Sequence, residues 1–371
     1  MKFKVFIISF LLLLSTGIAY ADGHGKTGTQ KIEQSIATLP NVAVSLCVDS
    51  GNVTVRGWDK NEVFARSSEV GRIELKGANS GAPAGGAAKV LVWLVDKPVG
   101  VEEKGGCDAF GDVELMVPRG AALYLQTGDG TIDVSDVASI FARSETGDIL
   151  VKKATRSVEV VSFSGEIAVA NSTGRMSMKS VSGIMTAANL RPNDQGDCFE
   201  ASSISGDIEL EGVDHQLVTV KTANGKIDFS GPLAHQGRYN FNTTSSDVTL
   251  SLPENSSFRL NARVARDREV VTDFPLDLTI EDPVPVVHKK ATPAPPAPPE
   301  PAPQPIPKAA PDPNQPVMVV VDPQDKTIKV KPVVVRTLYS LRRISAVHGS
   351  GDSLITIASF TGTIHLIDSG N

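Results

Sequence analysis

The feature that most constrains the fold is a five-residue phrase that returns through residues 110–250: a turn residue, a variable residue, then apolar, variable, apolar. The turn residues of this stretch are Gly111, Gly130, Gly147, Gly165, Gly183, Gly206, Gly225 and Ser246, and they lie 19, 17, 18, 18, 23, 19 and 21 residues apart. A fixed period of about 20 residues with a strand signal in each repeat is typical of a solenoid. Each coil can then bury its apolar side only against its neighbours.

Each phrase has the pattern of a half-buried strand. In Gly165-Glu-Ile-Ala-Val169 the two apolar residues share one face, while the residue between them faces water. A second apolar pair upstream, such as Val158 and Val160, gives at least two strands per coil. The sequence therefore predicts an all-β solenoid like a right-handed parallel β-helix. A sandwich of short strands is the alternative, although its turns usually recur every 8–12 residues or so.

The turn position itself has a physical requirement. It needs either a positive φ or room for a close neighbouring coil, and glycine supplies both. The same phrase also follows Gly51 and Gly362, so we add these two to the predicted turn-forming positions. Serine replaces glycine at Ser246.

The N-terminus has the pattern of a secretory signal peptide over residues 1–21. Lys2 and Lys4 precede an apolar run over 5–14, and Ala19-Tyr20-Ala21 forms a small-x-small cleavage site. We expect the chain to be exported, to the periplasm, the outer-membrane surface or the extracellular space, with no transmembrane span after cleavage. An uncleaved anchor is the alternative. Residues 22–40 are polar and Gly-rich at first and are predicted to form a disordered lead.

Past the solenoid region, predicted for residues 41–282, the composition changes abruptly. Residues 283–316 contain 14 prolines in 34 positions, which predicts an extended proline-rich linker. In residues 317–371 strand patterns return, and the segment 355–366 repeats the apolar pattern, turn and phenylalanine of 158–169. We therefore predict that the C-terminal segment folds back as the final, capping coil of the solenoid. A separate small domain on a tether is the alternative.

Composition and cysteine content limit the partners. The formal net charge is −6, with no Lys/Arg stripe interleaved with aromatic residues, which argues against nucleic acid. Three cysteines in an oxidising compartment allow at most one intramolecular pair. Cys107 and Cys198 both lie in Gly-rich loops and are the expected pair, whereas Cys47 sits in an alternating strand and is expected to be buried.

The sharpest candidate site is a column of acids just after the turn residues, namely Asp112, Asp148, Glu166, Asp207 and Asp247. A column of this kind could bind Ca²⁺, but Thr131, Ile184 and Lys226 interrupt it, and aspartate is also a common turn residue. The six histidines form no metal-spaced pair and are expected at the surface. No nucleophile elbow or phosphate-binding loop occurs, so we predict no enzyme, metal or cofactor.

Four phrases resemble a known family. They are Ser50-Gly-Asn-Val-Thr-Val-Arg-Gly-Trp-Asp59, Val113-Glu-Leu-Met-Val-Pro-Arg-Gly120, Thr127-Gly-Asp-Gly130 and Thr272-Asp-Phe-Pro275. In this order over residues 42–280 they are similar to the adhesin-type bacterial domain with β-strand repeats, the DUF4097 type. The resemblance implies an exported β-solenoid whose biochemical role is unassigned, and it supplies no catalytic residues.

Together these patterns favour a non-catalytic, adhesin-like scaffold of the cell envelope that binds an envelope glycan or protein. A structural element that associates end to end is one alternative, and a polysaccharide-active β-helix enzyme is another. The predicted cap favours a monomer, because it would cover the end of the stack.

Overall fold

The computed structural model describes residues 31–78, 86–96, 105–265, 267–281, 317–320, 329–332 and 341–370. The signal peptide predicted for residues 1–21 and the proline-rich linker predicted for 283–316 lie outside the described residues. The strands are β1 (Ile32–Ser50), β2 (Val53–Trp58), β3 (Glu62–Ser67), β4 (Arg72–Ala78), β5 (Ala87–Val95), β6 (Val113–Pro118), β7 (Ala122–Asp129), β8 (Ile132–Ser135), β9 (Ser139–Ser144), β10 (Ile149–Lys152), β11 (Ser157–Ser164), β12 (Ile167–Ala170), β13 (Arg175–Ser182), β14 (Met185–Leu190), β15 (Phe199–Ser202), β16 (Ile208–Val213), β17 (Leu217–Thr222), β18 (Ile227–Ser230), β19 (Arg238–Thr243), β20 (Val248–Leu252), β21 (Phe258–Ala265), β22 (Val270–Thr272), β23 (Asp277–Glu281), β24 (Val317–Val320), β25 (Lys329–Pro332), β26 (Leu341–His348), β27 (Ser353–Ser359) and β28 (Ile364–Asp368). One 3-10 turn, η1 (Gly106–Asp108), precedes β6.

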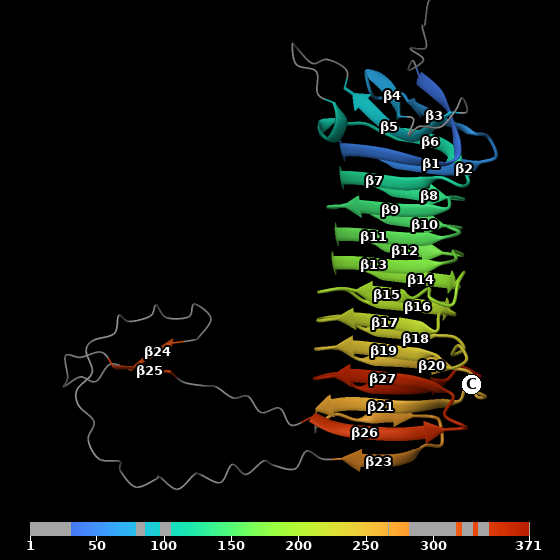
Figure 1. Cartoon of the computed structure of the whole chain (residues 1–371). Coiled ribbons are helices and arrows are strands. Elements are labelled where there is room, and N and C mark those ends of the chain that lie inside the picture. Colours follow the sequence, from blue (N-terminus) through green and yellow to red (C-terminus); the bar gives the residue numbers. More distant parts are fainter. Residues whose placement is uncertain are drawn as a thin grey trace, which may run out of the picture.

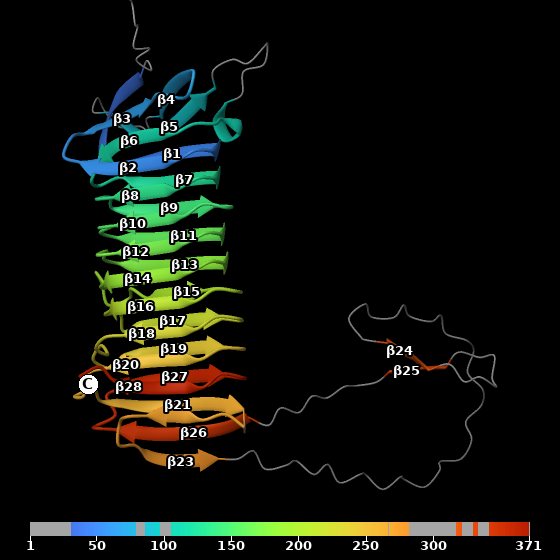
Figure 2. The same ribbon diagram turned by 180° about the vertical axis from the view of Figure 1, so that it is seen from behind.

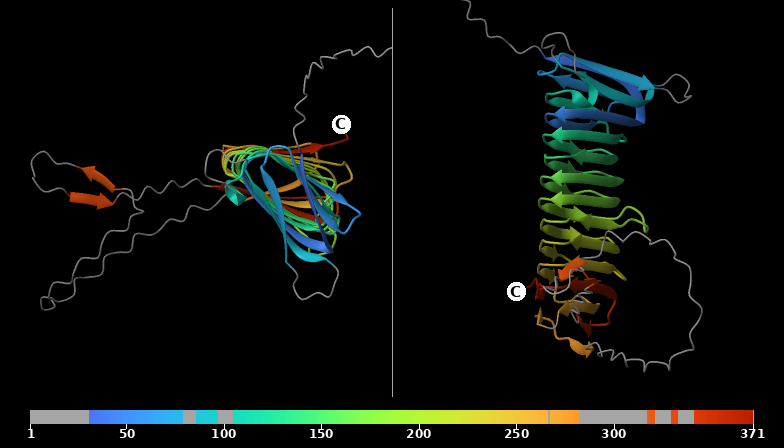
Figure 3. Two further views of the ribbon diagram at one scale, coloured as in Figure 1. Left: turned by 90° about the horizontal axis from the view of Figure 1, so that it is seen from above. Right: turned by 90° about the vertical axis from the view of Figure 1, so that its left-hand side faces the viewer.

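The predicted all-β solenoid is confirmed: the chain winds into a stack of flat coils (Figures 1 and 2). Each regular coil gives one strand to each of two facing layers, which we call sheets A and B and which are joined through β1 (Figure 3). From β8 onward the even-numbered strands to β20 pair in parallel in sheet A, and the odd-numbered strands from β7 to β19 pair in parallel in sheet B. Strands β24 and β25 form a separate antiparallel pair among the described strands.

The core lies between the two sheets. In the coil of β11 and β12, Val158, Val160, Ile167 and Val169 point inward and are buried. The same positions in neighbouring coils are in register, so the core consists of continuous apolar columns. Full burial of four such side chains contributes roughly 6–12 kcal/mol per coil before chain entropy is subtracted. A single coil could not fold alone on this contribution, which is why the coils stack.

The turn residues also form a column, with each coil's turn lying against the next. A Cβ added at Gly147 would lie 1.9 Å from the carbonyl oxygen of Gly130, and a Cβ at Gly206 would lie 2.1 Å from that of Gly183. Neither Gly147 nor Gly206 has a positive φ. At these corners, the close approach of the neighbouring coil excludes a side chain.

An inward hydroxyl lies three residues before most turn residues. This column was not predicted, and its members are Thr127, Ser144, Ser162, Ser180, Ser203, Thr222, Thr243 and Ser359. Several of these side chains bond to the backbone of the turns. Ser144 Oγ accepts a hydrogen bond from Gly147 N at 2.8 Å, and Ser359 Oγ accepts one from Gly362 N at 3.0 Å. Ser144 and Ser359 thus satisfy backbone groups that the tight turn would otherwise leave unpaired, whereas Ser162 Oγ and Ser203 Oγ have no partner among the described residues.

The last coil of the chain is inserted into the stack. Strand β27 pairs in parallel with both β19 and β21, and β28 pairs with both β20 and β22 (strands labelled β27 and β28 in Figure 2). We expected this C-terminal coil at the end of the solenoid, and that position is wrong. The coil of β21 and β22 lies further out, beyond the inserted coil, because the chain skips one coil position after Pro253.

The N-terminal end is built in the same way. The coil of β1 and β2 lies between β5/β6 and β7/β8, although it comes first in the chain. Both skips follow a segment of the same pattern, in which buried Val, Leu and a third apolar residue alternate before a Pro: Val113-Glu-Leu-Met-Val-Pro118 at one end and Val248-Thr-Leu-Ser-Leu-Pro253 at the other. Residues 32–40, predicted to be part of a disordered lead, instead form the start of β1, whose residues 32–37 pair antiparallel with β3.

Antiparallel strands close both ends of sheet B. Strand β4 pairs with β5 at the N-terminal end, and β26 and β23 follow β21 at the C-terminal end. Phe258, Phe274 and His348 pack their rings together beside this C-terminal edge. Within the described residues, no helix is long and apolar enough to span a membrane.

The predicted disulfide between Cys107 and Cys198 is wrong: Cys107 pairs with Cys47. Cys47 lies between the inward residues Leu46 and Val48, so its side chain points out from the outer face of β1. The turn η1, which contains Cys107, packs on this outer face. Cys198 precedes β15, which lies five strands from β1 in sheet B, or roughly 24 Å at the usual strand spacing. That separation is far too great for a disulfide.

Candidate binding surface on the outer face of sheet B

The column of acids after the turn residues has a structural role. Asp148 Oδ1 accepts a hydrogen bond from Glu166 N at 2.8 Å, and Asp207 Oδ1 accepts one from Lys226 N at 2.8 Å. Asp112 bonds in the same way to the backbone N of Asn52 at 2.7 Å. Each of these three aspartates thus ties its coil to a neighbouring coil. Among the described residues, no group of three or more His, Cys, Asp or Glu side chains is placed to hold a metal ion.

One histidine expected at the surface is instead buried. His215 is fully buried against Phe199, and its Nε2 lies 2.8 Å from the carbonyl oxygen of Gly174. Because a carbonyl only accepts, Nε2 carries the proton. Burial lowers the pKa of His215, an effect opposed by the hydrogen bond to Gly174 and the charges of Asp197 and Asp214. His24 and His288 lie outside the described residues.

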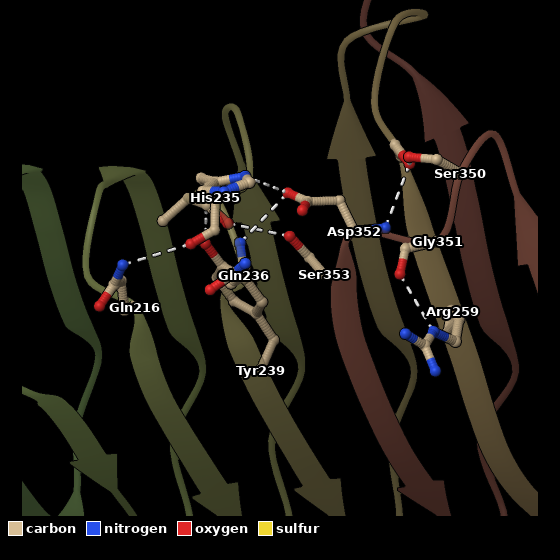
Figure 4. A network of polar contacts seen from close by, with 11 residues as sticks. Gln216, His235, Gln236, Tyr239, Arg259, Ser350, Gly351, Asp352 and Ser353 are labelled. Atoms are coloured by element: carbon tan, nitrogen blue, oxygen red, sulfur yellow. Dashed lines mark hydrogen bonds and ion pairs between the residues drawn. The ribbon is translucent and has the colours of Figure 1, made fainter.

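A polar network joins the inserted C-terminal coil to the corner of its neighbours (Figure 4). Asp352 Oδ2 accepts hydrogen bonds from Gln236 N at 3.1 Å and pairs with His235 Nδ1 at 2.9 Å. Ser353 Oγ donates to the carbonyl oxygen of Ala234 at 2.9 Å, and Arg259 Nε donates to that of Gly351 at 3.0 Å. These bonds hold the start of β27 in its slot between β19 and β21.

The His235–Asp352 pair has the geometry of two members of a hydrolytic triad, but the third is missing from its surroundings. In the region that the structure describes, no hydroxyl bonds to Nε2 of His235, and the nearby Ser353 donates to a backbone carbonyl instead. The His235 side chain is 78% exposed. A hydrolytic triad needs a nucleophile within hydrogen-bond reach of its base, whereas the contacts of Asp352 and Ser353 shown here join β27 to the corner at residues 234–236.

The outer face of sheet B carries two exposed aromatic rings on neighbouring strands. Tyr124 of β7 and Phe141 of β9 are in register, with ring centroids 6.4 Å apart and exposed fractions of 52% and 36%. They line a shallow groove of about 300 Å³, together with Ser157, Glu159 and Arg175. Such a groove presents flat apolar rings beside hydroxyl and charged groups, a combination suited to recognition of sugars or peptides.

Two rows of basic side chains run along the same face. The first row lies two residues after the aromatic rings, at the next outward position along each strand. It contains Arg143, Lys179, Lys221, Arg263 and Arg343, all in register. The second row lies two residues before the aromatic rings, at the preceding outward position, and contains Arg175, Arg238 and Arg259. All eight are exposed. Among the described residues, none of these eight side chains forms a salt bridge.

The charge of sheet B differs from that of the whole chain. From β7 to β26, the outward strand positions of sheet B carry these eight basic residues and two acids, Glu159 and Glu200. The whole chain has a formal charge of −6. On the outer face of sheet A, by contrast, Arg56 pairs with Asp133, whose pKa is lowered mainly by that hydrogen bond.

These surface residues were not identified from the sequence, in which we recognised no stripe of Lys and Arg beside aromatic residues. The signal was nevertheless present, because the outward positions are those that alternate with the buried apolar pairs. A basic residue recurs at the same outward position in alternate coils when the segments are aligned by their buried residues, as in Phe141-Ala-Arg143, Ser177-Met-Lys179 and Thr219-Val-Lys221. The inserted coil of β27 could not be placed in this series without the fold.

The fold and surface define an all-β solenoid of skipped and inserted coils with one basic, open face. Residues 99–266 match the family model described as Toastrack DUF4097, which confirms the predicted resemblance. A comparison with curated proteins finds no match.

Two solved structures show some likeness to this chain. The crystal structure of a putative adhesin from Parabacteroides distasonis is 11% identical, with a TM-score of 0.40 over 60% of this chain and 90% of that one. A putative cell adhesion protein from Clostridium sporogenes is 8% identical, with a TM-score of 0.17 over 91% of this chain and 100% of that one. At these TM-scores, neither likeness defines the fold or function of this chain.

Proposed function

We propose that this chain is an exported, non-catalytic scaffold of the bacterial cell envelope that binds an envelope glycan or protein along the outer face of sheet B, as an adhesin does. The observation that carries the proposal is the exposed pair of Tyr124 and Phe141 over a groove on that face. Exposed aromatic rings on neighbouring strands lower the solubility of a protein. Their presence beside polar groups therefore fits a surface that contacts a ligand or partner.

Two further features support the proposal. The disulfide between Cys47 and Cys107 fits an oxidising compartment, as expected for an exported chain. The parallel coils give a long, rigid and regular surface, which solenoid proteins commonly use for binding. Sheet B ends in antiparallel strands, β4 at one end and β26 with β23 at the other, which disfavours the stacking of a second copy as a continuation of the parallel coils.

The test is sedimentation of the full-length protein with envelope fragments from the bacterium that encodes it. We expect the protein to sediment with the fragments, and the double variant Tyr124→Ser with Phe141→Ser to sediment far less. The matched control is Val271→Ser with Ile367→Ser, which removes exposed apolar side chains from sheet A. Equal sedimentation of the two variants would reject sheet B as the contact face, and no sedimentation of the unaltered protein would reject the proposed function.

A further inference from the structure

We infer that the ligand of this face is an anionic polysaccharide, a linear glycan with regularly spaced carboxylates lying along sheet B. The inference rests on the proposed function and adds the chemical class of the ligand. It is carried by the arrangement of charge: a chain of net charge −6 collects exposed basic side chains on one face. A charged face attracts a ligand of opposite sign and orients it before contact.

The spacing of the charges points to a polymer with a repeat. In the longer row, Arg143, Lys179 and Lys221 occupy every second strand, with Val161 and Ser202 between them. Strands in a sheet lie about 4.8 Å apart, so these charges recur at about 10 Å along the stack. A glycan in which every second sugar is acidic carries one negative charge per disaccharide, a spacing similar to that of these basic side chains.

The residues between the two basic rows suit sugar hydroxyls. In the C-terminal half of the face, the middle row reads Thr219, Asn240, Thr356, Asn261 and Ser345 from β17 to β26. Hydroxyl and amide groups both donate and accept hydrogen bonds, as sugar hydroxyls do. This middle row lies between Lys221 and Arg263 on one side and Arg238 and Arg259 on the other.

The same region provides an anchoring pocket for one acidic group. Arg238 and Arg259 line a hollow of about 570 Å³, together with Gln236, Ser350 and Asp352. The bond from Arg259 Nε to Gly351 orients the guanidinium (Figure 4), and within the described residues no hydrogen bond uses its two Nη groups. A guanidinium held in this way is suited to bind a carboxylate through its remaining N–H groups.

A polysaccharide fits this face better than other polyanions. Duplex DNA carries one charge per about 1.7 Å of helix axis, far denser than the basic rows here. Single-stranded nucleic acid needs aromatic platforms for base stacking, whereas the middle row of the C-terminal half is made of hydroxyls and amides.

The inference is tested by measuring binding of the full-length protein to hyaluronan, which has one carboxylate per disaccharide, by biolayer interferometry. Uncharged dextran, duplex DNA and phosphatidylglycerol vesicles are run beside it, each at several salt concentrations. The test variant combines Lys221→Glu, Arg238→Glu and Arg263→Glu. The control variant makes the same charge change away from this face, with Lys152→Glu, Lys153→Glu and Lys226→Glu, and both are checked by thermal melting.

We expect hyaluronan to bind in a salt-sensitive way, and the test variant to bind about tenfold or more weakly while the control variant is unchanged. Equal binding of dextran, or equal loss in both variants, would overturn the inference. Tighter binding of DNA or of vesicles than of hyaluronan would also overturn it and assign the face to that partner. In each of these cases the proposed function stands if the protein still sediments with envelope fragments through Tyr124 and Phe141.

Discussion

Asp247 Oδ1 accepts a hydrogen bond from Thr363 N at 2.7 Å, although the two residues are 116 positions apart. The same contact joins Asp148 to Glu166 and Asp207 to Lys226 in coils that are adjacent in the sequence. The inserted C-terminal coil therefore docks with the same turn chemistry as the regular coils. Two coils can therefore stack through this contact whether or not they follow each other in the sequence.

Ending the chain at Glu281 should destabilise the whole C-terminal part of the solenoid. The truncation removes β26, β27 and β28, so β19 and β20 lose the coil that stacks on them, and β21 and β22 lose their contact with the rest. We expect a lower melting temperature, faster amide exchange in β19 and β21, and self-association through the unpaired strand edges. Light scattering and hydrogen exchange measure these effects. An unchanged melting temperature and mass would show that the inserted coil is dispensable.

Gly206→Ala should lower the free energy of unfolding by about 1–3 kcal/mol, as for an overpacked core site. The added Cβ would meet the carbonyl oxygen of Gly183 at 2.1 Å, so the two coils would have to separate at that corner. Gly196→Ala is the matched control, because a Cβ there meets nothing within 4 Å. Chemical denaturation of both variants measures the difference. Equal stabilities would mean that the turn column is less tightly packed than its geometry indicates.

Cys107→Ser should destabilise the N-terminal coils, by about 2–4 kcal/mol in the free energy of unfolding, because it opens a long covalent loop. Cys198→Ser should have little effect, because Cys198 is a free thiol. Peptide mapping without reduction should recover a peptide pair joined through Cys47 and Cys107, with Cys198 alkylated. A pair joined through Cys107 and Cys198 would contradict the structure.

Local patterns were enough to predict the solenoid. The apolar pairs and turn residues of each coil fix its two strands, and identical coils can only stack, so the parallel sheets follow from repeats such as the one ending at Val169. The hydroxyl three residues before most turn residues, as in Ser144 and Gly147, was also visible in the sequence but was overlooked. It recurs with the same period as the glycines.

Contacts between distant segments were harder to predict. The position of the C-terminal coil depends on the chain skipping a coil position after Pro253, and a repeat pattern gives no information on which neighbour fills the gap. The disulfide was missed because Cys47 looked like a core residue, whereas its partner covers the outer face of its strand. The basic rows appear only when the strands are set in register, so they too required the fold.

The stability of the protein should fall as the pH drops below about 6.5, and His215 should account for part of this fall. Burial lowers the pKa of His215 in the folded state, so the unfolded chain takes up a proton first. Stability is therefore fully present above the unfolded pKa and declines as the pH falls from there towards the folded pKa. The structural reason is that Nε2 already donates to Gly174, while the buried Nδ1 has no partner among the described residues. A proton on Nδ1 would bury an unpaired charged group.

The variant His215→Gln removes this titration, so its melting temperature should depend less on pH between about 7 and 5 than that of the unaltered protein. His365→Gln, on the outer face of sheet A, is the matched control and should keep the original pH dependence. Differential scanning calorimetry across this range measures both variants. If His215→Gln loses as much stability between pH 7 and pH 5 as the unaltered protein does, the acid sensitivity must come from other groups. The carboxylate of Asp197 is a poor candidate, because hydrogen bonds from the backbone of Asp194 and Asn193 lower its pKa from the ordinary value of 3.8.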